Sequence, residues 1–441
     1  MMGSFDLAIF DQTLWHYGRF ELPISTVRGM NILGDHFSPI LILLSPFRLL
    51  WHNAQVLLIL QAFIVCSSVY FIYLILEKKL QNSLAAYLLS ITTYFFLGLQ
   101  YALDYDFHLV SLSVLPISIL LYGLFNQKIK TYWLAILLLF LLKEDMAIIV
   151  FFIGLYQIVI QKKIKLGIIT SVVAGGFFLL ESQYLMPLFQ DNTTVVKNYI
   201  DFYSLGESKE EIIRTVVTKP WLVGQSMFDA PEKINTFIQT HKAFGFLPLL
   251  SPFYLLTTAP IWMERFLSFT KTRWLFDQYY GISLTPFLVI GTAHTIKRLS
   301  KIFPVKILKM NTVLMMTLLI FLFSFVAMLS AHAPLTRLIH PEYYQLSEVE
   351  KSMHKAVSII PDEVSVSAQQ PFVSHLSGRS QIYWFPEHID DSEYILVVNS
   401  RPSTPLNNEE RNDYISTLAK DSSKELVFEE NGIFVFKKIV L

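Results

Sequence analysis

The feature that most constrains this chain is an apolar run at residues 54–76 that contains no charged side chain. A helix needs about 20 apolar residues to cross the hydrocarbon layer of a bilayer, and this run is long enough. Further runs of similar character lie at 83–99, 109–125, 165–188, 281–295 and 311–330. The sequence therefore predicts an α-helical polytopic membrane protein with a transmembrane bundle over residues 54–330.

The composition agrees with this class. Of 441 residues, 53% are hydrophobic and only 16% are charged, whereas soluble domains carry about 25% charged residues. The formal net charge is zero, so no basic field indicates a nucleic-acid partner. The single cysteine, Cys66, lies within an apolar run and has no second cysteine with which to form an intrachain disulfide.

Short basic loops predict the orientation, because Lys and Arg are retained on the cytoplasmic side. Such loops lie at 78–79, 128–130, 162–165 and 297–309. The opposite side then holds residues 1–53 as a first outer loop, 100–108, a loop at about 189–241, and everything after 331. We expect a multi-pass protein of the cytoplasmic membrane whose domain at 331–441 is extracytoplasmic.

Residues 131–160 are apolar but are interrupted by Lys143-Glu144-Asp145 and have cytoplasmic lysines at both ends. The stretch must therefore cross and return, and its arms are too short to bring the charged apex to the outer surface. Placing a charge at membrane depth costs at least a few kcal/mol. We therefore expect these three residues to lie either in a functional cavity or in a buried structural ion pair, and the sequence favours neither alternative. Two proline-broken segments, 37–51 and 244–269, are predicted to be shallow and non-spanning.

The region after residue 330 is richer in charged residues, Ser and Pro, and predicts a small α/β domain. Ser347 with Glu350 resembles a helix capping box, and strand-like runs follow at 364–368, 381–385 and 394–399. Asn431-Gly432 lies between two more such runs. This dipeptide predicts a tight hairpin, because both turn residues need positive φ.

Candidate chemistry must come from the outer loops, because no phosphate loop, zinc-protease motif or nucleophile elbow is present. Asp6 and Asp11 are candidate general bases for an acceptor hydroxyl, and ordinary loop acids are an equal alternative. Asp35-His36 is a candidate metal-ligand pair, although Asp35 also suits a helix N-cap.

The other outer-loop candidates are Asp104, Asp106 and His108, whose oxygen and nitrogen atoms are the ligands that divalent ions use. A solvated loop is the alternative for these three. Arg265 and Arg273 are candidates for binding a lipid phosphate through paired N–H groups. Snorkelling of their side chains to the membrane interface is the alternative for each.

Three blocks in order carry a family resemblance: residues 5–12 (FDLAIFDQ), 34–39 (GDHFSP) and 143–147 (KEDMA). They resemble the signature blocks of a family of predicted prokaryotic membrane proteins of unknown function, the DUF2079 type. The similarity extends to Gln278-Tyr279-Tyr280 and to the tail around 360–361, 376–379 and Tyr383. The resemblance adds Gln278 and Tyr279 to the candidate cavity residues.

That family in turn resembles the GT-C glycosyltransferases, which move a sugar from a polyprenyl-phosphate donor to an acceptor outside the cytoplasm. The resemblance implies that Asp6 is the base or helps to bind a divalent metal ion, and that 37–51 lies along the membrane. It also implies a transmembrane helix before Asp6, which this sequence does not contain. Arg265, Arg273 or Lys143 would stabilise the departing phosphate. Two other classes of function are the alternatives: a transporter or lipid flippase, and a non-catalytic envelope assembly protein.

Overall fold

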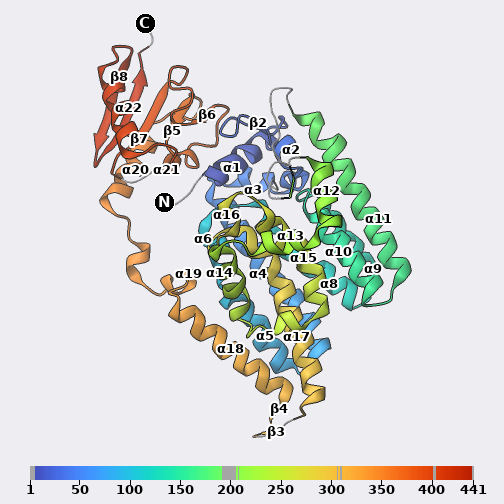
Figure 1. Ribbon diagram of the computed structural model, residues 1–441. Coiled ribbons are helices and arrows are strands. Elements are labelled where there is room, and N and C mark those ends of the chain that lie inside the picture. The colour runs from blue at the N-terminus through green and yellow to red at the C-terminus, as the bar shows by residue number, and fades with distance from the viewer. Residues whose placement is uncertain are drawn as a thin grey trace.

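The computed structural model describes residues 5–190, 205–206, 208–304, 306–307, 310–400 and 404–439. Helices make up most of it, and a small sheet lies near the C-terminal end of the chain (Figure 1). Residues 191–204 of the predicted outer loop and Lys309 of the last predicted basic loop lie outside the described residues, as do residues 1–4.

Three helices among the described residues are long and apolar enough to cross a membrane. They are α4 (Gln55–Leu80), α18 (Thr312–Ser330) and the continuous helix Ile164–Phe189, which comprises α11 (Ile164–Leu180), η2 (Glu181–Leu185) and η3 (Met186–Phe189). A fourth span is formed if α5 (Ser83–Phe95) and α6 (Leu97–Tyr105) are counted together, although they are bent by 44°. The helices predicted at 54–76, 165–188 and 311–330 are confirmed, and the one at 83–99 is confirmed with a bend. Which side of the membrane each loop faces stays a prediction.

The remaining bundle helices are shorter. Residues 109–125 form α7 (Leu109–Leu112) and α8 (Val114–Phe125), and 281–295 fall in η6 (Tyr279–Leu284) and α17 (Thr285–Ile302). α17 is buried from Thr285 to Ile296 except at His294, and it is not among the helices that are long and apolar enough to span. It forms an interior helix of the bundle.

The apolar stretch with the charged apex folds into α9 (Ile129–Phe140) and α10 (Met146–Val159), with Lys143-Glu144-Asp145 in the turn between them. α10 packs closely on α11 because both carry glycine at the contact. A side chain on Gly167 would lie 2.7 Å from the Gly154 carbonyl oxygen, and small residues of this kind let membrane helices approach each other. The predicted break of residues 131–160 into two helices at the charged apex is confirmed, and the crossing and return of these helices in the membrane stay a prediction.

The proline-broken segment 37–51 forms two short helices, η1 (Pro39–Leu43) and α3 (Ser45–Leu50). No candidate spanning helix lies in the described residues of 37–51 or 244–269, as predicted. The shallow position of both segments stays a prediction. After η5 (Leu247–Leu250), one 16-residue helix, α15 (Pro252–Leu267), continues through Pro260 with much of its surface buried. Pro252 stands in the first turn, where its missing N–H costs nothing, so it begins a helix rather than breaking one.

The other elements connect these parts. The N-terminal segment contains α1 (Phe5–Tyr17), β1 (Ile24–Ser25), β2 (Met30–Asn31) and α2 (Ile32–Asp35). The later connections contain α12 (Lys209–Thr218), α13 (Pro220–Met227), α14 (Pro231–Lys242), α16 (Lys271–Trp274), β3 (Lys306–Ile307), β4 (Met310–Asn311), α19 (Pro334–Arg337) and η7 (Pro341–Tyr344).

The C-terminal region is a five-stranded sheet in the order β6-β5-β7-β9-β8. Its strands are β5 (Val366–Ala368), β6 (Ile382–Trp384), β7 (Tyr394–Val398), β8 (Lys424–Glu430) and β9 (Ile433–Lys438), and its helices are α20 (Glu348–Ser358), α21 (Gln370–Val373) and α22 (Asn408–Lys420). The Ser347–Glu350 capping box is present. Asn431 and Gly432 turn with φ of 52° and 74°. The predicted small α/β fold is present in this region, and Figure 1 shows it beside α1. Its status as a separate domain with the bounds 331–441 stays a prediction.

Candidate functional site

A cavity of about 230 Å³ lies where the N-terminal segment, α7 and η6 meet. Its polar lining consists of Asp6, Arg28, Asp35, His36, His108 and Tyr279, and its apolar lining of Phe5, Ile9, Phe10 and Ile32. Five of the six polar residues were predicted from the sequence as site residues. The fold therefore brings together side chains from three separate regions of the chain.

Asp6 stands in the first turn of α1 and is partly buried. Among the described residues, its carboxylate has no hydrogen-bond or ion-pair partner. Burial raises the pKa of Asp6 to about 6, although the charges of His36 and Arg28 oppose the rise. A carboxylate that titrates near the working pH and faces a cavity suits a general base.

Arg28 and Asp35 form a two-point ion pair at one wall of the cavity. Arg28 Nε and Nη2 donate to the two Asp35 oxygens at 2.9 and 3.1 Å. Burial opposes the ionisation of Asp35, but the hydrogen bonds from Arg28 outweigh it and lower its pKa. The alternative that Asp35 is a helix N-cap was wrong, because Asn31 caps α2 through the Leu33 amide and Asp35 ends that helix.

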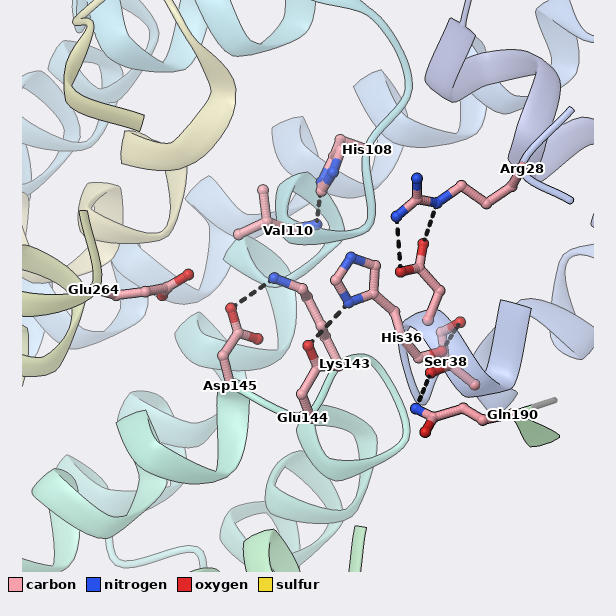
Figure 2. Close-up of polar contacts among 12 residues, drawn as sticks. Arg28, His36, Ser38, His108, Val110, Lys143, Glu144, Asp145, Gln190 and Glu264 are labelled. Atoms are coloured by element: carbon pink, nitrogen blue, oxygen red, sulfur yellow. Dashed lines mark hydrogen bonds and ion pairs between the residues drawn. The ribbon is translucent and has the colours of Figure 1, made fainter. Parts of the chain in front are cut away.

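His36 and Glu144 link the cavity to the α9–α10 turn. His36 Nδ1 lies 2.9 Å from Glu144 Oε1, and Figure 2 shows the two side chains meeting between their segments. Burial disfavours the charged imidazole, but the Glu144 carboxylate more than compensates and raises the pKa of His36. Burial likewise opposes the ionisation of Glu144, and the charge of His36 overcomes it and lowers the pKa of Glu144. Each group therefore holds the other in its charged form.

Lys143 and Asp145 form a second pair in the same turn, at 2.9 Å. Figure 2 shows Glu264 of α15 pointing toward this pair, and Arg273 lies 3.7 Å from Glu264. The charged apex thus contains buried ion pairs, as one of the two predicted alternatives required. The same turn also supplies Glu144, the partner of the cavity residue His36, and a functional role of the turn stays a prediction.

His108 lies against Tyr279, with ring centroids 3.8 Å apart in a stacked arrangement. Its Nδ1 accepts a hydrogen bond from the Val110 amide at 3.3 Å and so caps α7. Burial lowers the pKa of His108 well below its usual value. The ring is therefore neutral and forms an aromatic wall of the cavity.

Asp104 and Asp106 lie outside the cavity, which corrects the predicted Asp104, Asp106 and His108 ligand group. Asp104 pairs with Arg337 at 2.8 Å. Asp106 accepts from the Leu7 amide at 3.1 Å and from the Phe107 amide at 2.8 Å. In residues 5–190 and the other described ranges, no group of three or more His, Cys, Asp or Glu side chains is placed to hold a metal ion.

The bond from Leu7 gives Asp106 a structural role. It satisfies an amide in the first turn of α1, where helical N–H groups have no partner in their own helix. That amide directly follows Asp6 in the chain. Asp106 therefore positions the candidate base without facing the cavity.

We expect Asp106→Asn to flatten the pH dependence of stability between about pH 6 and 8. Burial raises the pKa of Asp106 to about 8 from its usual 3.8, so the folded protein keeps a proton that the unfolded chain has lost. Stability then falls as the pH rises, by at most about 1.4 kcal/mol per pH unit. Other groups, such as His36, also titrate in this range, but they are present in both proteins, so the difference in slope between Asp106→Asn and the unmodified protein reports on Asp106. Unfolding temperatures in detergent, measured against pH, test this.

The Asp104→Asn variant is the matched control, because it neutralises an exposed acid two positions away. Its unfolding temperature should depend on pH with the same slope as that of the unmodified protein. An unchanged slope in Asp106→Asn would show that Asp106 is already ionised.

The predicted phosphate-binding residues also lie away from the cavity. Arg265 is buried and donates to the carbonyl oxygens of Arg273 and Leu275 at 3.0 and 3.1 Å. Lys143 and Arg273 are next to the acids of the α9–α10 turn and α15. Gln278 lies 3.5 Å from Asp277 Oδ1 and does not line the cavity. The basic groups that do line it are Arg28 and His36.

Asp11 is removed from the catalytic candidates by its surroundings. It is fully buried, and its two oxygens accept from Arg48 Nε and Nη2 at 2.6 and 3.2 Å. The Ser377 hydroxyl donates to it at 2.8 Å. Asp11 faces away from the Asp6 cavity because the two residues are five positions apart on α1, and it joins α1 to α3 and to the C-terminal domain.

Sequence reasoning missed Arg28 and the acid Glu181 of η2. No local sequence pattern identifies Arg28, because its role depends on the β1–β2 turn that brings it to Asp35. Glu181 did carry a signal: it is the only charged residue between Lys165 and Phe189, and a lone acid inside a predicted span is a functional candidate.

The described residues contain three apolar helices of spanning length and a polar cavity where the N-terminal segment, α7 and η6 meet, which together define a helical membrane protein. The chain belongs to DUF2079, a family described as predicted membrane proteins, which matches residues 1–435. No curated protein matches the chain.

Proposed function

We propose that this protein is a GT-C-type glycosyltransferase that moves a sugar from a polyprenyl-phosphate donor to an acceptor hydroxyl at the outer face of the cytoplasmic membrane. The observation that carries the proposal is the unpaired Asp6 carboxylate, which faces a cavity that also contains Arg28 and His36. A base beside two cations suits a reaction that takes a proton from one substrate and releases an anion from the other.

In the proposed reaction the Asp6 carboxylate accepts the proton of the acceptor hydroxyl. The acceptor oxygen then forms a bond to the anomeric carbon of the sugar, and the bond from that carbon to the phosphate oxygen breaks. The phosphate leaves with the electron pair, and Asp6 later returns its proton to water. The pKa of about 6 suits this cycle, because the group is ionised at neutral pH and is still basic enough to accept a proton.

Arg28 and His36 replace Arg265, Arg273 and Lys143 as the groups proposed to stabilise the departing phosphate. Arg28 uses Nε and Nη2 to bind Asp35 and keeps its remaining N–H donors for a ligand. His36 uses Nδ1 to bind Glu144, which leaves Nε2 as its other donor when the ring is protonated. Both cations can therefore hold a phosphate without giving up their carboxylate partners.

An apolar groove of about 270 Å³ between α10, α12 and α15 supports a lipid donor. Its lining is aliphatic or aromatic except for Asp145 and Glu264. Asp145 pairs with Lys143, whose neighbour Glu144 pairs with His36 of the cavity. We propose that the prenyl chain lies in this groove and that its phosphate reaches Arg28 and His36 beyond the two ion pairs.

The test is sugar transfer by the purified full-length protein in liposomes, with donors that differ only in their carrier. We expect transfer from a polyprenyl-phosphate sugar and none from the matching nucleotide sugar. Ile148→Trp, which fills the groove, should raise the donor KM several-fold, whereas Ile59→Trp on the exposed face of α4 should not. Equal use of both donors, or no transfer from any lipid-phosphate sugar, would reject the proposal.

A further inference from the structure

The helix that continues from α11 into η2 contains an acid that the proposed reaction does not use. Glu181 is fully buried, and neither of its carboxylate oxygens has a hydrogen-bond partner in the described part of the chain. It is the first residue of η2, a π-helical turn within a helix long and apolar enough to span the membrane. Such turns are frequent at functional sites.

Two further acids lie beside Glu181 because α10 and α11 pack antiparallel. Gly167 lies against Ile158, Gly154 against Ser171 and Gly175 against Phe151. The same register places Glu181 beside Glu144 and Asp145, at the start of α10. Each of these acids uses one oxygen for its basic partner, His36 or Lys143. The second oxygen of each, Glu144 Oε2 and Asp145 Oδ1, is buried without a partner. Four unpartnered carboxylate oxygens therefore belong to one cluster.

This cluster contains more acids than the bases beside it can neutralise. His36 and Lys143 are already paired with Glu144 and Asp145, and Arg273 lies 3.7 Å from Glu264. No basic side chain within the described ranges is bonded to Glu181. An ionised carboxylate buried without a partner costs so much free energy that the group takes up a proton instead.

A proton also supplies the hydrogen-bond donor that the cluster lacks. Ionised carboxylates only accept hydrogen bonds, whereas a protonated carboxyl also donates one. Carboxylates that share a site cannot all ionise, so one of them keeps its proton. No metal-binding group of three or more His, Cys, Asp or Glu residues occurs in the described residues, and a proton needs no additional space.

We propose that Glu181 is a proton-binding site that holds a proton at neutral pH, beside the unpartnered oxygens of Glu144 and Asp145. Uptake and release of this proton require no reactant other than water. Because Glu144 pairs with His36, the state of Glu181 alters the charge next to a residue of the Asp6 cavity. The inference does not depend on sugar transfer, since it rests on the burial and neighbours of Glu181.

Infrared spectroscopy of the full-length protein in lipid tests the proposal, because a protonated carboxyl has a C=O stretch distinct from that of a carboxylate. At pH 7 we expect a band that disappears in Glu181→Gln and is retained in Glu342→Gln, which changes an exposed glutamate. The band should weaken as the pH is raised. Identical spectra of Glu181→Gln and the unmodified protein in this region would overturn the assignment.

A second measurement does not depend on the folding of Glu181→Gln. Carboxyl labelling of glutamate with ¹³C shifts glutamate bands away from those of Asp6, Asp11 and Asp106, whose pKa values are also raised by burial. Burial raises the pKa of Glu264 as well, so the labelled protein carries Glu264→Gln, and we expect it to retain a protonated glutamate band at pH 7. Absence of this band would mean that Glu181 is ionised. A rise in unfolding temperature with sodium concentration would mean that Glu181 holds a cation. Either result would overturn the proposal.

Discussion

Asp6→Asn is expected to lower the rate of sugar transfer about 10²- to 10⁴-fold, the usual range for removal of a general base. The asparagine side chain has nearly the same shape and cannot accept the proton. Asp6 has no bonded partner among the described residues, and burial disfavours its ionised form, so the free energy of unfolding at pH 7 should stay the same or rise. Transfer rates and unfolding temperatures measured on one preparation separate the two effects.

The pH dependence gives this prediction a second readout. Only the ionised carboxylate accepts a proton, so the rate in the unmodified protein should rise as the pH passes about 6, the pKa of Asp6. That rise should be absent from the residual activity of Asp6→Asn. Asp104→Asn is the control, because Asp104 pairs with Arg337 outside the cavity. An Asp6→Asn protein that retained the full rate and the same pH profile would exclude Asp6 as the base.

The helices could be predicted from the sequence because their signal is local. The run that became α4 has no charge over the thickness of a bilayer. The turn at Asn431-Gly432 also needs only its own two residues, both of which adopt positive φ. Pro252 and Pro260 show the limit of such reasoning. A proline in the first turn of a helix gives the same sequence signal as one that breaks a helix, and its position became clear only from the bounds of α15.

The site could be predicted only in part, because its contacts join distant segments. Asp6, Asp35, His36, His108 and Tyr279 share the cavity as expected. Asp6 and Asp11 have the same residue type and lie on one helix, yet they face different surroundings. The partners of Asp11 are 37 and 366 positions away. No local pattern identifies such partners, so the sequence could not distinguish a catalytic acid from a structural one.

Arg48→Ala is expected to destabilise the protein by about 3–5 kcal/mol, because it leaves the Asp11 carboxylate buried without its cation. Arg48 and Asp11 are 6% and 0% exposed, respectively, so water cannot replace the guanidinium without rearrangement. Ser377 would remain as a single donor. Since Ser377 belongs to the C-terminal domain, we expect that domain to loosen from α1, with faster proteolysis around residues 331–347 and a lower unfolding temperature.

The matched control is Lys351→Ala, which removes a base from an exposed ion pair with Glu348. Exposed pairs contribute at most about 1 kcal/mol, so this variant should unfold and be cleaved almost as the unmodified protein is. A double variant, Arg48→Met with Asp11→Leu, removes both charges and should recover much of the lost stability, since no buried charge remains unpaired. If Arg48→Ala were no less stable than Lys351→Ala, the buried pair would not be what fixes the C-terminal domain to α1.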